Sequence, residues 1–182
     1  MTNRDRLFEI LSRFRAHFVT AHTHESEHLF HGGVHEHVVS TVCGAWWSGP
    51  ICWDGTPNGY HLYEARSGEL SWSFRPTGLG DRQLRVHRAG AEIVANVWNW
   101  DPEWKVFWHE DGLRRGEMKR TRGLDPTAVA LYQGKDRPRK SPEWVEPVAT
   151  DHLFRARPSG GSVAVEVVDR FGRTFVSRIE EG

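Results

Sequence analysis

From His35 onward, the sequence is a succession of short apolar segments separated by turn-forming residues, and this pattern constrains the fold more than any other feature. In the segment "SVAVEVVD", Val163, Val165 and Val167 occupy every second position, as in a strand with one buried face. Glycine-containing turns, such as Arg66-Ser67-Gly68 and Phe171-Gly172, separate segments of this kind. Short strands at this spacing predict antiparallel β-structure and, near the C-terminus, a small β-sandwich.

Other segments of the same character are also predicted to be strands. They are "HEHVVSTVCGAWW", "YHLYEA", "LSWSFRP", "RQLRVHR", "AEIVANVWNW", "WKVFWHED", "DHLFRARP" and "RTFVSRIEE". Residues 112–147 are rich in charge, glycine and proline, and we expect a long loop there. One short helical or extended piece, "DPTAVALYQ", interrupts that loop.

The N-terminal segment has a different pattern. Leu7, Ile10, Leu11 and Phe14 recur at helical spacing between charged residues, which predicts an amphipathic helix. "AHFVTA" follows as a short strand, and a polar loop comes after it, as at the end of an α/β unit. We therefore predict a mainly β protein with a short N-terminal α/β remnant. A change of composition near residue 89 divides it into residues 1–88 and 89–182.

Charge and hydropathy argue against several classes of partner. Lys+Arg and Asp+Glu both number 24, so the net charge of zero gives no general attraction for nucleic acid or anionic membranes. The basic patches at residues 114–115, 119–122 and 135–140 are expected in solvated loops. No apolar run approaches the roughly 20 residues of a membrane span, and the start lacks the apolar region of a signal peptide. The sequence leaves the cellular compartment open.

The two cysteines do not by themselves define a redox environment. Cys43 and Cys52 could pair across a loop, but without a secretory signal we expect both to stay reduced.

The stretch from His17 to His37 holds seven of the chain's 11 histidines and is a candidate metal site. On an extended backbone, residues i and i+2 point the same way, so His22 and His24 can face one cation. Imidazole suits zinc, iron and manganese, but a pair is only half a site, since three or four protein ligands are usual. The remaining candidate ligands are His28, His31, His35, His37, Glu25, Glu27 and Glu36. Those four further histidines are expected in a polar loop.

The segment "VTAHTHE" resembles the last metal-binding motif, Gly-His-x-His, of the calcineurin-like metallophosphoesterases. "HVVSTVCGAWWSGPICWDGTPNGYHLYEA", "VANVWNWDPEWKVFWHEDG" and "VEVVDRFGRTF" resemble blocks of a subgroup that carries a C-terminal β-domain. The resemblance covers nearly the whole chain. It implies part of a metallophosphoesterase sheet followed by a β-sandwich-like domain. It also implies a phosphoester substrate and a centre of two divalent metal ions, with His22 and His24 among the ligands. Ala21 replaces the motif's glycine, which is tolerable unless the backbone needs a positive φ.

The family's other ligand motifs are missing from residues 1–182. There is no Asp-x-His and no Gly-Asn-His, and "GDRQL" has Leu84 where Gly-Asp-x-x-Asp requires an aspartate. The resemblance thus implies the C-terminal part of an enzyme, inactive alone and unable to hold the metal ions stably. An upstream polypeptide would supply the other ligands, and an exposed sheet edge would favour homo-oligomers. The alternative is a non-catalytic β-rich module that binds a partner protein or a carbohydrate.

Nine tryptophans are the anomaly of composition. The resemblance places a substrate cleft near the metal site, and its candidate residues are Trp46, Trp47, Asp54, Asn58 and Tyr60. Packing between sheets is the alternative role of the tryptophan pair, and turn formation is that of Asp54 and Asn58. A second tryptophan group is expected in the core of the β-domain, with a carbohydrate-binding platform as its alternative; it comprises Trp98, Trp100, Trp104 and Trp108.

Overall fold

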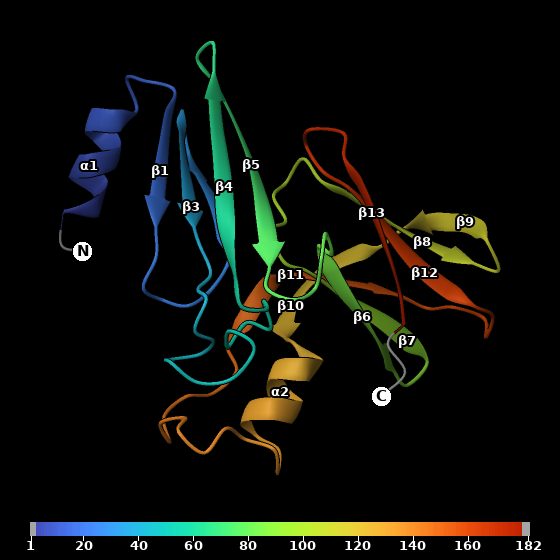
Figure 1. Ribbon diagram of the computed structural model, residues 1–182. Coiled ribbons are helices and arrows are strands. Elements are labelled where there is room, and N and C mark those ends of the chain that lie inside the picture. Colours follow the sequence, from blue (N-terminus) through green and yellow to red (C-terminus); the bar gives the residue numbers. More distant parts are fainter. Residues whose placement is uncertain (1–2, 180–182) are drawn as a thin grey trace.

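The computed structural model describes residues 3–179, and this part of the chain is mainly β, as predicted (Figure 1). The helices are α1 (Arg4–Leu11) and α2 (Pro126–Tyr132). The strands of the N-terminal half are β1 (Ala16–Thr20), β2 (Glu27–His31), β3 (Val34–Val38), β4 (Gly59–Arg66), β5 (Glu69–Pro76) and β6 (Leu84–Ala89). Those of the C-terminal half are β7 (Glu92–Val97), β8 (Lys105–Glu110), β9 (Leu113–Glu117), β10 (Lys119–Leu124), β11 (Ala149–Ala156), β12 (Val163–Val168) and β13 (Thr174–Arg178). None of the helices within residues 3–179 is long and apolar enough to cross a membrane.

The N-terminal segment forms a three-stranded sheet in the order β1-β3-β2. The predicted helix and strand are present as α1 and β1, and β1 runs parallel to β3. β2 pairs antiparallel to β3 and corrects the expectation of a polar loop, since it contains His28 and His31. The expected α/β arrangement is therefore present only as the parallel pair of β1 and β3, and the residues that connect these two strands contain no helix.

The strand predicted over residues 35–47 ends at Val38 in the structure, so that prediction was too long. Gly44, Trp46, Trp47 and Gly49 all have positive φ, which is incompatible with an extended strand. A Cβ on Gly44 would lie 2.3 Å from the carbonyl oxygen of Ser48, so glycine is required for this turn to close.

Strands β4 and β5 form the predicted hairpin, separate from the other sheets. Ser67 and Gly68 at its tip have φ values of 50° and 80°, the conformation that suits a two-residue hairpin turn. Trp72 and Phe74 of β5 are 3% and 0% exposed, so one face of this hairpin is buried. Figure 1 shows the hairpin in green between the blue N-terminal sheet and the C-terminal strands.

Strand β6 and the strands of the C-terminal half form two four-stranded sheets, in the orders β10-β11-β7-β6 and β13-β12-β8-β9. Their apolar faces share one core, to which Val86, Ile93, Val106 and Val165 contribute. This arrangement confirms the predicted sandwich. The division between residues 88 and 89 stays a prediction, and the antiparallel pairing of β6 with β7 extends across it.

The second tryptophan group lies in and around this core. Trp98 and Trp104 are 1% and 4% exposed, and Trp100 and Trp108 pack against the core while only partly buried. Because two of the four indoles are buried, these residues do not form an exposed binding platform.

The loop predicted over residues 112–147 contains β9 and β10, which is a correction, whereas α2 is the short helical piece predicted within that loop. Both strands lie at sheet edges and expose most of their side chains, so their sequences need no apolar alternation. The first two basic patches therefore lie on strands and not in loops. Their arginines contact carboxylates: Arg114 pairs with Glu166, and Arg115 lies 3.6 Å from Glu110.

Both cysteines are free thiols. Cys52 is fully buried, and the loss of solvation raises the pKa of its thiol well above the usual value.

A buried polar network joins the N-terminal loops to the sandwich. The carboxylate of Asp54, 1% exposed, accepts hydrogen bonds from the Ser26 backbone N–H at 2.8 Å and the Thr56 hydroxyl at 2.9 Å. His152 of β11 lies 3.3 Å from the same carboxylate and 2.7 Å from Oδ1 of Asn96. Three segments far apart in the sequence are thus fixed by one side chain.

Replacing Asp54 with alanine should lower the free energy of unfolding by about 3–5 kcal/mol, because it leaves a buried imidazole and buried donors without their partner. Denaturant titration measures this loss. The control is Asp81→Ala, which removes an exposed ion pair with Arg75 and should cost less than about 1 kcal/mol. Equal effects of the two substitutions would contradict the role assigned to the network.

Candidate functional site

A shallow groove of about 450 Å³ lies where β1 ends, beside the start of β4. Its lining includes His22, His24 and Tyr60, three of the residues predicted from the sequence, together with His61 and Tyr63. The structure therefore brings the two motif histidines and one predicted cleft residue to the same depression.

The backbone of the motif differs from the expected extended form. β1 ends at Thr20, and His22 and His24 have φ values of 93° and 58°. The expectation that they share a face because they lie on a strand is therefore wrong; a bend brings them to one groove. Ala21 does not have a positive φ, so alanine is accommodated in the place of the motif's glycine.

The ring of Trp46 packs against the rings of both histidines. Its ring centroid lies 5.7 Å from that of His22 and 5.2 Å from that of His24. Nδ1 of His24 lies 2.7 Å from the carbonyl oxygen of Gly44 and 3.1 Å from the backbone nitrogen of Trp46. One nitrogen cannot donate to the carbonyl and accept from the N–H in the same tautomer. From the shorter contact we infer that Nδ1–H donates to Gly44, which leaves the lone pair of His24 on Nε2.

Unfavourable backbone conformations are concentrated around the two motif histidines. Six residues other than glycine have positive φ in the described part of the chain, and Ser67 and Asp111 account for two of them in hairpin turns. The other four are His22, His24, Trp46 and Trp47. Such conformations cost on the order of 1–3 kcal/mol each and persist only where surrounding contacts enforce them.

The remaining predicted cleft residues lie outside the lining of the groove. Trp47 is 77% exposed to solvent, whereas Asp54 is buried in the network described above. Nδ2 of Asn58 donates to the carbonyl oxygen of Gly49 at 3.2 Å, and its backbone N–H donates to Pro50. For Asp54 and Asn58 these contacts match the alternative role of turn formation.

Carboxylates lie near His22, but not in the groove. A second pocket, of about 440 Å³, shares His22 with the groove and is lined also by Glu25, Glu27 and Glu36. Arg4 neutralises Glu36 at 2.8 Å. Burial, and then the negative charges of Glu27 and Asp54, raise the pKa of Glu25 to about 7.

The donor set of the groove does not fit a complete two-metal centre. Its lining supplies the imidazoles of His22, His24 and His61, but no carboxylate. Two divalent cations held for hydrolysis need bridging and charge-balancing carboxylates. The residues that line the groove could hold part of such a centre and not all of it.

A second group of histidines lies on the strands of the N-terminal sheet, although His28, His35 and His37 among them were expected in a polar loop. His17 of β1, His28 of β2, and His35 and His37 of β3 share one face of that sheet and meet Trp72 of β5. The alternation His35-Glu36-His37 was the signal that could have placed two of them on one face.

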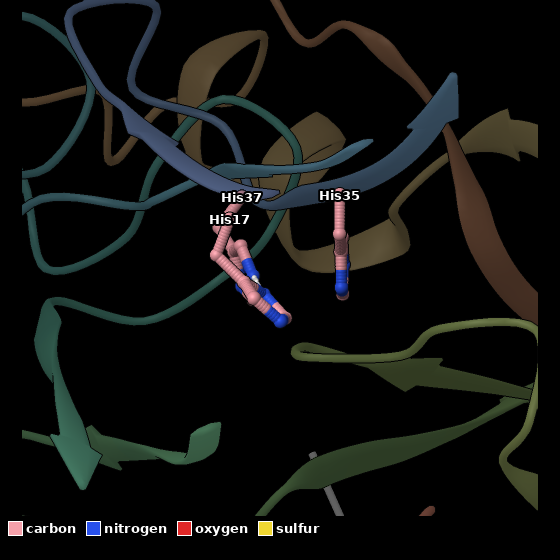
Figure 2. Close-up of side chains that lie close together, drawn as sticks. All are labelled: His17, His35 and His37. Atoms are coloured by element: carbon pink, nitrogen blue, oxygen red, sulfur yellow. Dashed lines mark hydrogen bonds between the residues drawn. The ribbon is translucent and has the colours of Figure 1, made fainter. Parts of the chain in front are cut away.

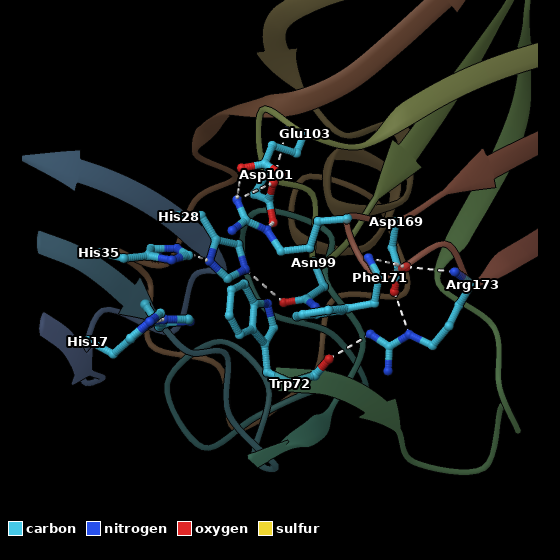
Figure 3. Close-up of polar contacts among 12 residues, drawn as sticks. His17, His28, His35, Trp72, Asn99, Asp101, Glu103, Asp169, Phe171 and Arg173 are labelled. Carbon is cyan, nitrogen blue, oxygen red and sulfur yellow. Dashed lines mark hydrogen bonds and ion pairs between the residues drawn. The ribbon is translucent and has the colours of Figure 1, made fainter. Parts of the chain in front are cut away.

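Hydrogen bonds extend this group toward the sandwich, as Figure 3 shows. Nδ1 of His28 lies 2.8 Å from Nε2 of His35, and its Nε2 lies 3.0 Å from Oδ1 of Asn99. His61 of the groove lies 3.1 Å from the same oxygen of Asn99. Burial lowers the pKa of His35 to about 3, of His37 to about 2 and of His61 to about 4, so all three are neutral at pH 7.

The depressed pKa of His61 predicts a pH dependence of stability. Its folded-state pKa of about 4 lies below the unfolded value near 6.5, so its contribution is complete above pH 6.5 and is lost as the pH falls toward 4. The free energy of unfolding of His61→Gln should therefore fall less steeply than that of the unsubstituted chain between pH 7 and 4.5. Denaturant titrations at several pH values test this. Parallel curves for the two proteins over that window would contradict it.

A known protein family matches most of the sequence. The family described as the C terminal of calcineurin-like phosphoesterase matches residues 36–175, which include the end of β3, the β4–β5 hairpin and nearly all of the sandwich. The matched region begins after His22 and His24. No curated protein and no solved structure matches the chain. The match spans most of the sequence, and the chain therefore belongs to the family of calcineurin-like phosphoesterase C-terminal domains.

Proposed function

We propose that this chain forms the C-terminal part of a metal-dependent phosphoester hydrolase. In this role, His22 and His24 each contribute an imidazole to a two-metal centre. The groove beside them, with Tyr60 on its rim, forms one wall of the substrate site. Divalent metal ions supply the Lewis acid and the activated water in enzymes of this kind.

The strained backbone at the groove is the observation that carries the proposal. Backbone strain gathers at catalytic and ligand-binding sites, because ordinary packing gives no reason to retain it. Here it coincides with the two histidines of the metal-binding motif, with Trp46, which packs beside them, and with the adjacent Trp47. Two hairpin turns account for the positive φ values at other non-glycine residues among those described.

The tautomer inferred for His24 supports the same role. Histidines that bind metals usually donate their second ring N–H to a carbonyl or carboxylate, which fixes the ring and leaves the other nitrogen free for the metal. A donor bond from Nδ1 of His24 to the Gly44 carbonyl would do this. His24 is 9% exposed, so the ring is also held by packing.

The proposed two-metal centre needs carboxylate ligands in addition to His22 and His24. Residues 1–182 contain neither Asp-x-His nor Gly-Asn-His. We propose that a further polypeptide supplies the carboxylates and covers the exposed apolar side chains of α1, β1 and the turn between them. These side chains include Ile10, Phe14 and Val19, which are 49%, 63% and 51% exposed. Burying such a surface would favour association.

Histidine substitutions test the catalytic proposal. In a protein that unites residues 1–182 with a phosphoesterase polypeptide carrying the other motifs, His22→Ala and His24→Ala should each lower kcat on a model phosphodiester by roughly a hundredfold or more. His31→Gln, on β2 and outside the groove, should leave kcat unchanged. Metal-dependent turnover by residues 1–182 alone would contradict the need for additional ligands, and unchanged kcat in both alanine variants would contradict the role of the motif.

A second function, binding without catalysis, is favoured by an aromatic cluster next to the groove. Trp144 is 55% exposed, and its ring lies 4.9 Å from that of Trp46 and 6.3 Å from that of Trp53. Exposed indoles next to one another are common where proteins bind carbohydrates or other proteins.

Tryptophan fluorescence separates the two functions. If the cluster binds glycans, adding them should shift the emission of the unsubstituted chain, and Trp144→Ala should abolish the saturable part of the shift. Trp104→Phe removes a buried tryptophan from the sandwich and serves as the control, in which the shift should persist. A panel of glycans without effect on either protein would leave the binding function without support.

A further inference from the structure

One face of the N-terminal sheet places three imidazoles around a common point. β1 and β3 are parallel and in register, with His17 opposite His35 and Val19 opposite His37, so all three histidine side chains leave the sheet on the same side. One ring nitrogen of each residue lies within 4.8 Å of the other two. Figure 2 shows the three rings projecting together from the strands.

From this arrangement we propose that His17, His35 and His37 bind a transition-metal dication such as Zn²⁺, at a site distinct from His22 and His24. Three imidazoles with one open position form a common zinc donor set. Imidazole nitrogen suits zinc, copper and nickel, whereas calcium and magnesium need oxygen ligands. The chemistry of the group therefore selects the class of cation.

The contact between His17 and His37 is close to the spacing that a cation requires. Nδ1 of His17 lies 2.9 Å from Nε2 of His37, so one proton lies between two nitrogens that point at each other. Two nitrogen ligands of a tetrahedral zinc ion are about 3.3 Å apart, so the rings need to separate by a few tenths of an ångström. A cation replaces the shared proton, which the exposed second nitrogen of His17 can carry instead.

The ring of His37 has an unpaired atom. His37 is 1% exposed, and its Nδ1 is buried without a hydrogen-bond partner. Buried polar atoms are nearly always paired in folded proteins, so an orphan marks an arrangement that internal hydrogen bonds alone do not explain. An ion bound at Nε2 of His37 would place the proton of this ring on Nδ1.

The third histidine, His35, is oriented by hydrogen bonds that run through His28 to Asn99. Oδ1 of Asn99 can only accept, so with its amide in this orientation His28 carries its proton on Nε2 and accepts from Nε2–H of His35 at Nδ1. His35 then keeps its lone pair on Nδ1. A ligand whose second ring nitrogen is held by a hydrogen bond is typical of metal-binding histidines.

Charge and access are both compatible with a cation. The positive groups that act on these histidines include the guanidinium of Arg170, with which Asp101 pairs through contacts of 2.7 and 2.9 Å. Glu103 lies 3.3 Å from the same guanidinium and offsets its charge further. His17 is exposed while His35 and His37 are buried, so a metal ion can enter from the side of β1.

Metal titration of the untagged 182-residue chain tests the proposal. Co²⁺ should give the visible absorption of a tetrahedral nitrogen-bound ion, and calorimetry with Zn²⁺ should show one ion bound per chain. His17→Gln should weaken the affinity for Zn²⁺ roughly tenfold or more. This substitution is at an exposed position, and far-UV circular dichroism checks that it leaves the fold intact. A chain that binds no Zn²⁺, or a His17→Gln variant that binds as tightly as the original, would overturn the proposal.

Matched variants separate this site from the motif of the proposed enzyme. The double variant His22→Ala/His24→Ala and the variant His31→Gln, on the opposite face of the same sheet, should both keep the original affinity. Loss of binding in the double variant alone would assign the ion to the groove and reject this site. In the unsubstituted chain, Zn²⁺ should also shift the imidazole NMR signals of His35 and His37, a readout that depends on no substitution and on no enzyme activity.

Discussion

The buried carboxylate of Asp54 is the constraint on which the arrangement of the groove depends. A carboxylate that is 1% exposed is tolerated only when its oxygens find polar partners, and here these partners come from three separate segments. Ser26 belongs to the loop after β1, Thr56 to the turn before β4, and His152 to β11 of the sandwich. Because one carboxylate must satisfy all three, the segments cannot move independently. His24, two residues before Ser26, is thereby fixed relative to the sandwich.

The tryptophan side of the groove is supported in a similar way by Tyr132 at the end of α2. Its hydroxyl accepts from the backbone of Ala45 at 3.3 Å and contacts the carbonyl oxygens of Ser48 and Ile51. These contacts enclose the turn that carries Trp46. Asp125 caps the helix through the N–H of Ala128 at 2.9 Å, so the position of Tyr132 depends on a capped helix. Positive φ values at the groove can persist because both of its sides are held by buried hydrogen bonds.

The parts of the fold that the sequence predicts are those with a local signal. Alternating valines identify β12, and the Ser67-Gly68 turn identifies the β4–β5 hairpin. β9 and β10 were missed because an edge strand with exposed side chains needs no apolar pattern, and β3 was drawn too long because positive φ at Trp46 and Trp47 has no residue-type signal. At the site, the motif identifies His22 and His24 but not their bend. The cluster of His17 with β3 depends on the parallel register of two strands separated in sequence, which no local pattern encodes.

The chain contains two His-x-His pairs that differ in what holds them in place. His35 and His37 lie on a regular strand, where the pleat places both rings on one face without strain and the sheet buries them. His22 and His24 need a strained bend, which leaves His22 exposed and next to a groove. The first geometry would enclose an ion within the sheet, whereas the second leaves His22 open to solvent. The two are mechanically connected, because β1 ends at Thr20, two residues before His22. An ion between His17 of β1 and the histidines of β3 would tie these strands together and so fix the start of the loop that carries His22 and His24.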